Sequence, residues 1–163
     1  MSEAQQIITR LGLEPLKPEG GYFTRTWTGK IIPGTAGPCG TAIYFLLTPE
    51  TFSAFHRLQA DELWHFYAGD TVEHWQLQAD GSASQCVLGN DIPAGQVPQV
   101  HVLAQTWQAA CLMQNTPEPR GWSLLGCTMT PGWRDEDFEL GARAQLLLLF
   151  PAQQTIVKRL TPA

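Results

Sequence analysis

The sequence predicts a mainly β domain, either a sandwich or a barrel, with short helices near both termini. Short runs of apolar and β-preferring residues recur from Thr41 onward at intervals of about 8–12 residues, which is typical of sandwiches and barrels. Asp80-Gly81 separates two of these runs, and this dipeptide favours a tight hairpin turn. Apolar residues at helical spacing occur near the two ends of the chain. These observations favour an antiparallel β architecture over a parallel α/β one.

Helices are predicted at both ends. Ser2 and Gln5 match a capping box, apolar residues follow at helical spacing, and Gly12 is a natural stop. In the tail, Pro151 separates two further helical patterns, because proline cannot continue a helix. The predicted helices cover residues 3–11, 142–150 and 152–160.

The strands are predicted between these helices. The turn Pro-Glu-Gly-Gly at 18–21 is interpreted as a backbone feature, since adjacent glycines adopt torsions that other residues avoid. It leads into a strand over 22–27, and a glycine- and proline-rich loop follows over 29–40. Further strands are predicted over residues 41–47, 63–67, 72–78, 84–88, 99–104, 106–113 and 122–129. The whole chain, 1–163, is predicted to be one domain, since domains commonly have roughly 100–150 residues.

Charge and composition exclude several classes of partner. The net charge is −5, and ten lysines and arginines are scattered singly, so we expect no binding to nucleic acid or to an anionic membrane surface. The apolar run 146–150 is too short to span a bilayer, and residues 1–10 lack the features of a signal peptide. We therefore expect a cytoplasmic protein. The four cysteines show no metal-like spacing, so we expect inert thiols.

The block FHRLQADELWHFYAGD, residues 55–70, concentrates the groups that could do chemistry. If 63–67 is a regular strand, alternation places Glu62 on one face with Trp64 and Phe66. His65 then faces the opposite side, where we expect it to pack or to lie in an interface. The polar groups of this block are therefore not expected to form one cluster.

Several stretches together resemble the small single-domain cupins, in the Cupin_5 branch of the RmlC-like superfamily. They are PEGGYFTRTW (18–27), TAIYFLL (41–47), SAFHRLQADELWHFYAGD (53–70), TWQAA (106–110) and GCTMTPGW (126–133). The resemblance implies the cupin double-stranded β-helix, which is a jelly-roll barrel. It also implies a homodimer.

The general cupin motifs are only partly present. His56 matches the first histidine and Glu62 the glutamate, whereas Leu58 stands at the second histidine and Gln108 is nearest to the third. A catalytic metal generally needs three or more protein ligands. We therefore expect no resident cofactor. A divalent transition metal held by His56 and Glu62 is the alternative.

Three uses of the predicted internal pocket stay open. His56 and Glu62 could transfer protons next to a carbonyl, as in a metal-independent epimerase or isomerase of the sugar type. The pocket could instead bind a small, partly apolar ligand passively. The third use is a metal-dependent oxygenase with a degenerate ligand set. The residues predicted to contact the ligand are Arg25, Trp64, Phe66, Trp75 and Gln108.

Overall fold

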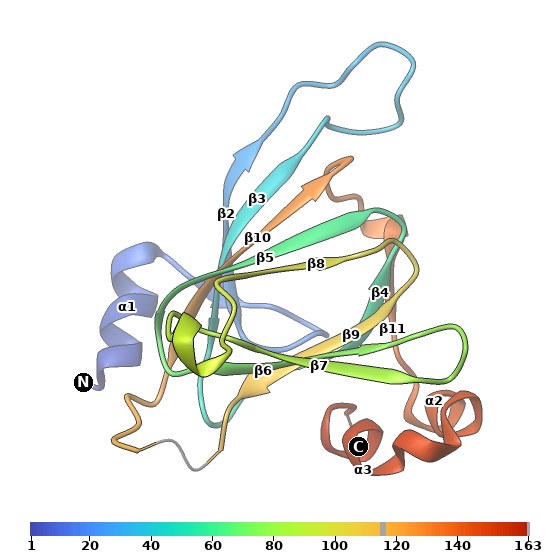
Figure 1. Ribbon diagram of the computed structural model, residues 1–163. Helices are drawn as coiled ribbons and strands as arrows, with labels where there is room; N and C mark the ends of the chain where they lie inside the picture. The colour runs from blue at the N-terminus through green and yellow to red at the C-terminus, as the bar shows by residue number, and fades with distance from the viewer. Residues whose placement is uncertain (115–116, 163) are drawn as a thin grey trace.

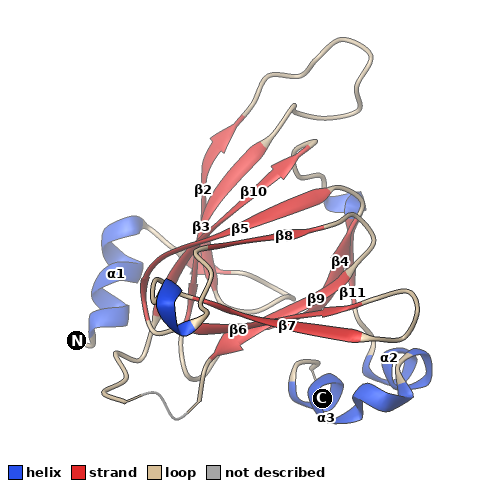
Figure 2. Ribbon diagram, in the orientation of Figure 1, coloured by secondary structure: helices blue, strands red, loops and turns tan. Residues whose placement is uncertain are grey.

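Two antiparallel sheets lie face to face in the computed structural model, which describes residues 1–114 and 117–162 (Figure 1, Figure 2). The first sheet contains, in spatial order, β1 (Glu14–Pro15), β2 (Tyr22–Thr28), β3 (Thr41–Leu47), β10 (Ser123–Thr130), β5 (Asp61–Gly69) and β8 (Gln99–Val102). The second contains β11 (Phe138–Leu140), β4 (Ser53–Leu58), β9 (Trp107–Leu112), β6 (Val72–Leu77) and β7 (Ala83–Leu88). This is the mainly β architecture that the sequence predicted.

The predicted helices are confirmed. Helix α1 (Glu3–Leu11) begins after Ser2, whose side chain accepts a hydrogen bond from the Gln5 N–H at 3.2 Å. It ends at Gly12, which has a φ of 63°. In the tail, α2 (Arg143–Leu149) and α3 (Gln154–Arg159) are joined by a 3₁₀ turn that starts at Pro151. Two more 3₁₀ turns cover Ile92–Ala94 and Asp135–Asp137.

The Asp80-Gly81 turn is also confirmed, at the tip of the β6–β7 hairpin. Gly81 has a φ of 86°, which favours glycine, and the Asp80 carboxylate accepts a hydrogen bond from the Ser82 N–H at 2.9 Å. The predicted strands all correspond to strands of the structure within a few residues. The sequence missed β4 and the two short strands β1 and β11.

Strand β4 was missed because it is buried on both faces. Ala54 and His56 point into the barrel, whereas Phe55 packs against the tail helices on the outside. Such a strand shows no alternation of apolar and polar residues, which is the main signal of a half-buried strand.

The core is divided between two layers. One apolar cluster fills the space between the sheets and includes Phe45, Leu125 and Val72. A second cluster lies between the outer face of the second sheet and the helices α2 and α3, where Trp107 meets Leu146. Figure 2 shows these helices on the side of the second sheet. The second sheet is therefore covered on both faces.

The outer face of the first sheet is more open. Helix α1 lies beside part of it, where Glu3 accepts a hydrogen bond from the Trp122 indole at 2.8 Å. Tyr44 and Tyr67 remain 36% and 47% exposed on this face. The β2–β3 connection projects beyond the barrel (Figure 1). Within the described residues, no helix is long and apolar enough to cross a membrane.

Candidate functional site

A cavity of about 580 Å³ lies between the sheets, over the inner face of β2, β3, β10 and β5. Strand β4 and the segment 16–19 border it from the other side. Its walls are largely apolar and include Phe23, Ile43, Phe45, Leu58, Met129 and Trp133. Size and character are both typical of sites for small molecules, which occupy about 300–1,000 Å³.

Four of the side chains predicted for the site line this cavity. His56 comes from β4 in the second sheet, whereas Glu62 and Trp64 come from β5 in the first. These three are buried. Arg25 comes from β2 and is exposed to solvent. The cavity thus combines a buried polar interior with a cation that reaches water.

Phe66 and Gln108 lie beyond the cavity wall. Phe66 shares the inner face of β5 with Trp64, but it packs into the apolar cluster between the sheets. Gln108, on β9, stands behind Glu62 and donates a hydrogen bond to it. Both residues therefore contact residues that line the cavity but do not line it themselves.

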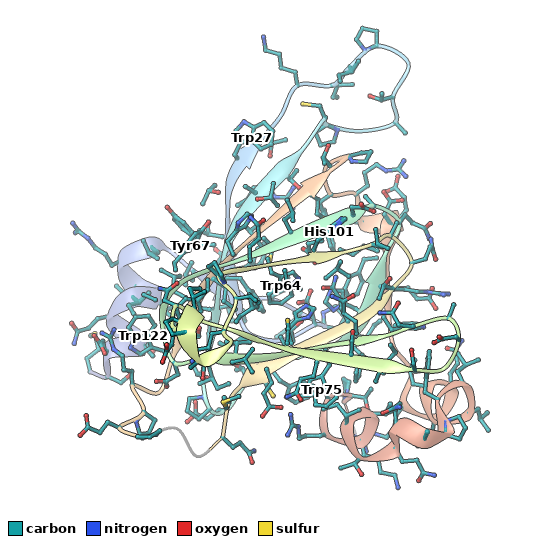
Figure 3. The ribbon with its side chains drawn as sticks, viewed as in Figure 1. Trp27, Trp64, Tyr67, Trp75, His101 and Trp122 are labelled. Carbon is teal, nitrogen blue, oxygen red and sulfur yellow. The ribbon has the colours of Figure 1, made fainter. Side chains whose placement is uncertain are left out.

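Trp75 does not line the barrel, contrary to the expectation from the sequence. Figure 3 shows Trp64 between the sheets and Trp75 on the side of the tail helices, where it packs against the second apolar cluster. Adjacent residues of a strand face opposite sides, so the inward position belongs to His74, which is fully buried. The predicted contact between Trp75 and a ligand in the barrel is inconsistent with this orientation.

His56 is held with one ring nitrogen free for chemistry. Its Nδ1 lies 2.8 Å from the carbonyl oxygen of Ala54, which can only accept, so Nδ1 carries the proton and donates. In the neutral ring, Nε2 therefore presents a lone pair. This Nε2 lies 4.0 Å from a carboxylate oxygen of Glu19, and the ring stacks on Phe138 with centroids 5.5 Å apart.

Glu19 is a site residue that the sequence analysis missed. It belongs to the Pro-Glu-Gly-Gly turn, is 8% exposed, and accepts a hydrogen bond from the Ser53 hydroxyl at 2.7 Å. The turn brings it inward because Gly20 runs against the backbone of Phe52, where a Cβ atom would lie 2.1 Å from the carbonyl oxygen. The signal in the sequence was a charged residue beside two glycines at the start of a strand.

Glu62 is buried among donors and charges. Its Oε2 accepts hydrogen bonds from the Gln108 amide at 2.7 Å and from the Trp64 indole at 3.0 Å. Burial raises the pKa of the Glu62 carboxyl from its ordinary 4.5 to about 7, and the Glu19 charge acts in the same direction. The His56 charge and the two hydrogen bonds oppose this rise. Near neutral pH, Glu62 is therefore divided between acid and carboxylate.

His74 is a second residue that the sequence analysis did not assign. Its Nε2 lies 3.3 Å from the Gln108 side-chain oxygen, and its Nδ1 has no hydrogen-bond partner among the residues described. Burial lowers the pKa of His74 to about 4, with the His56 charge acting in the same direction and the bond to Gln108 opposing it. His74 is therefore neutral at pH 7. No sequence motif marks His74. Only its contact with Gln108 in the structure shows that it belongs to the site.

The four cysteines are free thiols. Cys127 is buried and lines the cavity. Burial raises the pKa of its thiol well above the ordinary value, with the charges of Glu62 and Glu19 adding to the effect. Cys127 is therefore a neutral thiol in the wall, which makes it a poor nucleophile.

The polar side chains on the outer face of β5 have hydrogen-bond partners. His65 lies on the outer face, 3.2 Å from the Thr128 hydroxyl. Asp61 accepts a hydrogen bond from the Ala104 N–H at 2.9 Å and contacts His101 at 2.8 Å. These positions agree with the alternation predicted along β5.

The side chains near the cavity do not fit a metal site of the cupin kind. Within the described residues, no group of three or more histidines, cysteines, aspartates or glutamates converges as metal ligands would. Leu58 carries no donor atom, and the side-chain oxygen of Gln108 already accepts from Trp64 at 2.9 Å. Glu62 is partly neutral near pH 7, which weakens it as a ligand. The donor set thus falls short of the three ligands that a catalytic metal generally needs.

Several solved structures resemble this chain over most of its length. Protein SO0799 from Shewanella oneidensis is 32% identical, with a TM-score of 0.90 over 99% of both chains. A hypothetical protein from Leishmania major is 28% identical, with a TM-score of 0.90 over 100% of both chains. A dTDP sugar isomerase from Desulfovibrio desulfuricans is similar in fold, at 14% identity and a TM-score of 0.55, over 85% of this chain and 83% of that one. A search of functionally curated proteins gives no match.

The family comparison covers most of the chain. The model of the family Cupin_5, described as Cupin superfamily (DUF985), matches residues 5–141. This range contains every strand of both sheets and every polar group that lines the cavity. The chain belongs to the Cupin_5 family of the cupin superfamily.

Proposed function

We propose that this cupin binds a small molecule in its cavity and transfers a proton next to a carbonyl group of that ligand, as an epimerase or isomerase of the sugar type. One observation carries the proposal: His56, whose Nε2 presents a lone pair in the neutral ring, and Glu62, with a pKa of about 7, line the same cavity. A lone pair that can take a proton and an acid that titrates near neutral pH, side by side in one cavity, are suited to general acid–base catalysis. The 14% identity to a dTDP sugar isomerase supports the fold alone.

His56 is the base in this proposal. Its Nε2 lone pair takes a proton from a carbon next to the carbonyl, and the electron pair of the broken C–H bond moves toward the carbonyl oxygen. The bond from Nδ1 to Ala54 fixes the ring, and the Glu19 carboxylate faces the imidazolium charge that forms. Return of the proton to carbon restores the neutral ring.

Glu62 is the acid in this proposal. In its protonated form it donates a hydrogen bond, or the proton itself, to the oxygen that gains charge when carbon is deprotonated. Burial keeps this form populated up to about neutral pH. We therefore expect the exchange to decline above about pH 7, as Glu62 becomes a carboxylate.

Arg25 and Trp64 contribute to binding in this proposal. In the part of the chain that the structure describes, no carboxylate forms an ion pair with Arg25. Its guanidinium is available to an anionic group of the ligand, while Trp64 and the apolar walls contact the remainder.

Hydrogen exchange in D₂O tests this function. The protein is incubated with a panel of nucleotide-linked keto sugars, and proton NMR follows loss of the signal next to the carbonyl. We expect exchange with the wild type and none with His56→Ala, whose melting temperature should stay near that of the wild type. The matched control is His101→Ala, since His101 is exposed and paired with Asp61.

Other outcomes select the alternative uses. Thermal stabilisation by a sugar without exchange would favour passive binding. Exchange that is lost on chelation and restored by a divalent transition metal would favour a metal-dependent enzyme. A large loss of stability in His56→Ala would assign His56 a structural role.

We propose in addition that the chain forms a homodimer through the outer face of the first sheet. Tyr44 and Tyr67 are exposed there and pack edge to face at 6.1 Å, with His65 stacked on Tyr67 at 6.4 Å. Aromatic residues are enriched at protein interfaces. Light scattering should report a dimer that Tyr67→Lys converts to monomer. Ile92→Lys, at another exposed apolar side chain, should leave the dimer intact.

A cytoplasmic location stays a prediction, which cell fractionation would test.

A further inference from the structure

The orientation of the Gln108 side chain follows from its neighbours. The Trp64 indole Nε1 lies 2.9 Å from one side-chain atom of Gln108, and an indole N–H can only donate. That atom of Gln108 must therefore be the amide oxygen. The amide nitrogen then faces Glu62 Oε2 at 2.7 Å and donates to it.

His74 contacts the same Gln108 oxygen from a second side, and its tautomer follows from the orientation of Gln108. Because the Gln108 oxygen can only accept, His74 Nε2 must carry a proton and donate at 3.3 Å. A neutral imidazole has one such proton, so Nδ1 is bare, which agrees with its lack of a partner among the described residues. The Trp64 indole N–H, which can only donate, thus fixes the oxygen of Gln108, and His74 donates to the same oxygen, while the amide nitrogen faces Glu62.

This arrangement distinguishes the two oxygens of Glu62. Oε2 receives an N–H from Gln108 and the Trp64 indole N–H, which it shares with the Gln108 oxygen, whereas neither of these donors reaches Oε1. A hydroxyl at Oε2 would set its proton against two N–H groups. Oε1 carries no such conflict. The neutral acid is therefore favoured with its proton on Oε1.

We propose that Gln108 and His74 are positioning residues that confine the acid proton of Glu62 to Oε1 and keep Oε2 as the carbonyl oxygen. Gln108 is the nearest counterpart of a histidine of the general cupin pattern, and here its amide donates to the Glu62 carboxyl. The proposal gives more detail to Glu62 as the acid. The importance of this proton placement for catalysis rests on the proposed function. The titratable groups that face Glu62 are His56 from β4, Glu19 from the segment 16–19 and Cys127 from β10.

Infrared difference spectroscopy of the ligand-free protein tests where the proton sits. At pH 5.5 the protonated Glu62 gives a carbonyl stretch, identified by its loss in Glu62→Gln. If Oε2 is the carbonyl oxygen, it accepts two hydrogen bonds, and removal of one donor in Gln108→Leu moves the stretch to higher frequency. If the proton sits on Oε2, the carbonyl oxygen is Oε1 and the stretch does not move. The second result would overturn the proposal.

A titration provides a second readout. Carboxyl ¹³C NMR of glutamate-labelled protein follows Glu62, and we expect a midpoint near 7 in the wild type. Loss of a hydrogen bond to the charged form in Gln108→Leu should raise the midpoint by about one pH unit. Gln108→Glu keeps the shape and replaces the donor by a second carboxyl, so it should raise the midpoint further and serves where Gln108→Leu fails to fold.

The contribution of His74 is tested separately. His74→Phe should raise the Glu62 midpoint by less than Gln108→Leu, because Trp64 still holds the Gln108 oxygen. The control His101→Phe should leave it unchanged. A His74→Phe protein with lower thermal stability and an unmoved midpoint would remove His74 from the proposal. All these measurements use ligand-free protein, so a lack of turnover would count against the proposed function alone.

Discussion

The two ends of the barrel interior differ in what fills them. At one end, Leu125, Val72 and Leu88 are fully buried and pack into a dense apolar cluster. At the other end, the same two sheets enclose a cavity of about 580 Å³ that holds buried ionisable groups. Trp64 stands between the ends and packs edge to face on Phe45 at 5.5 Å. The packed end stabilises the fold. The cavity end contains polar groups whose burial is unfavourable but which chemistry requires.

The same substitution at both ends gives the largest expected effect. Leu125→Ala removes a side chain with 0% exposure from the packed end, so unfolding should become easier by about 4 kcal/mol. Leu58→Ala removes a side chain that lines the existing cavity, so the loss should be lower, about 2 kcal/mol. Urea denaturation measures both. Equal losses would mean that the two ends are packed alike.

The next effect is a dependence of stability on pH that arises at the cavity end. The pKa of Glu62 is higher in the folded protein than in the unfolded chain, so the folded state binds more protons between about pH 4.5 and 7. Stability from this group is therefore lost as pH rises through that window, and a shift of this size corresponds to roughly 3 kcal/mol.

Glu62→Gln should remove this slope. The variant should match the wild type near pH 4.5 and become more stable than it by up to roughly 3 kcal/mol above pH 7. His74 contributes a slope of opposite sign, because its pKa is lowered to about 4 and its charging below pH 6.5 destabilises the folded state. That slope is present in both proteins and cancels in their difference. Urea midpoints between pH 4.5 and 8 measure the difference, and parallel curves would contradict the assignment.

The smallest expected effect on stability is that of a substitution at Trp75, which lies in the outer layer and not in the cavity. Trp75→Ala removes a half-buried ring from the contact between the second sheet and the tail helices, so it should lower stability by about 2 kcal/mol. Ligand-induced thermal stabilisation should stay unchanged, because the ring lies outside the barrel. A loss of ligand binding at unchanged stability would place Trp75 in the site after all.

The sequence was informative where one local rule determined the structure. The capping box at Ser2 and Pro151 in the tail marked the helices, and the alternation along β5 separated Glu62 from His65 correctly. It missed β4, which is covered on both faces, and for β6, which is covered in the same way, it predicted the strand but not which face points inward. For His74 and Trp75, alternation shows that they face opposite sides, but either residue is acceptable inside. The tail helices decide the matter by covering the face that carries Trp75.

The polar residues of the site were predictable to different degrees. His56 and Glu62 were found because motif spacing marked them. Glu19 was missed because its side chain turns inward through a close approach of Gly20 to Phe52, a long-range contact. The role of Gln108 depends on Trp64 and His74, which come from two other strands. Distances across the barrel are not readable from one sequence.

The tail helices have a practical consequence for anyone who expresses this protein. The family match ends at residue 141, and α2 and α3 follow it. A chain cut at that boundary would keep every strand but expose Phe55, Leu77 and Trp107 to water. Such an apolar patch promotes aggregation. The shortened protein should accumulate in inclusion bodies, although the cavity lies on the opposite side of the sheet.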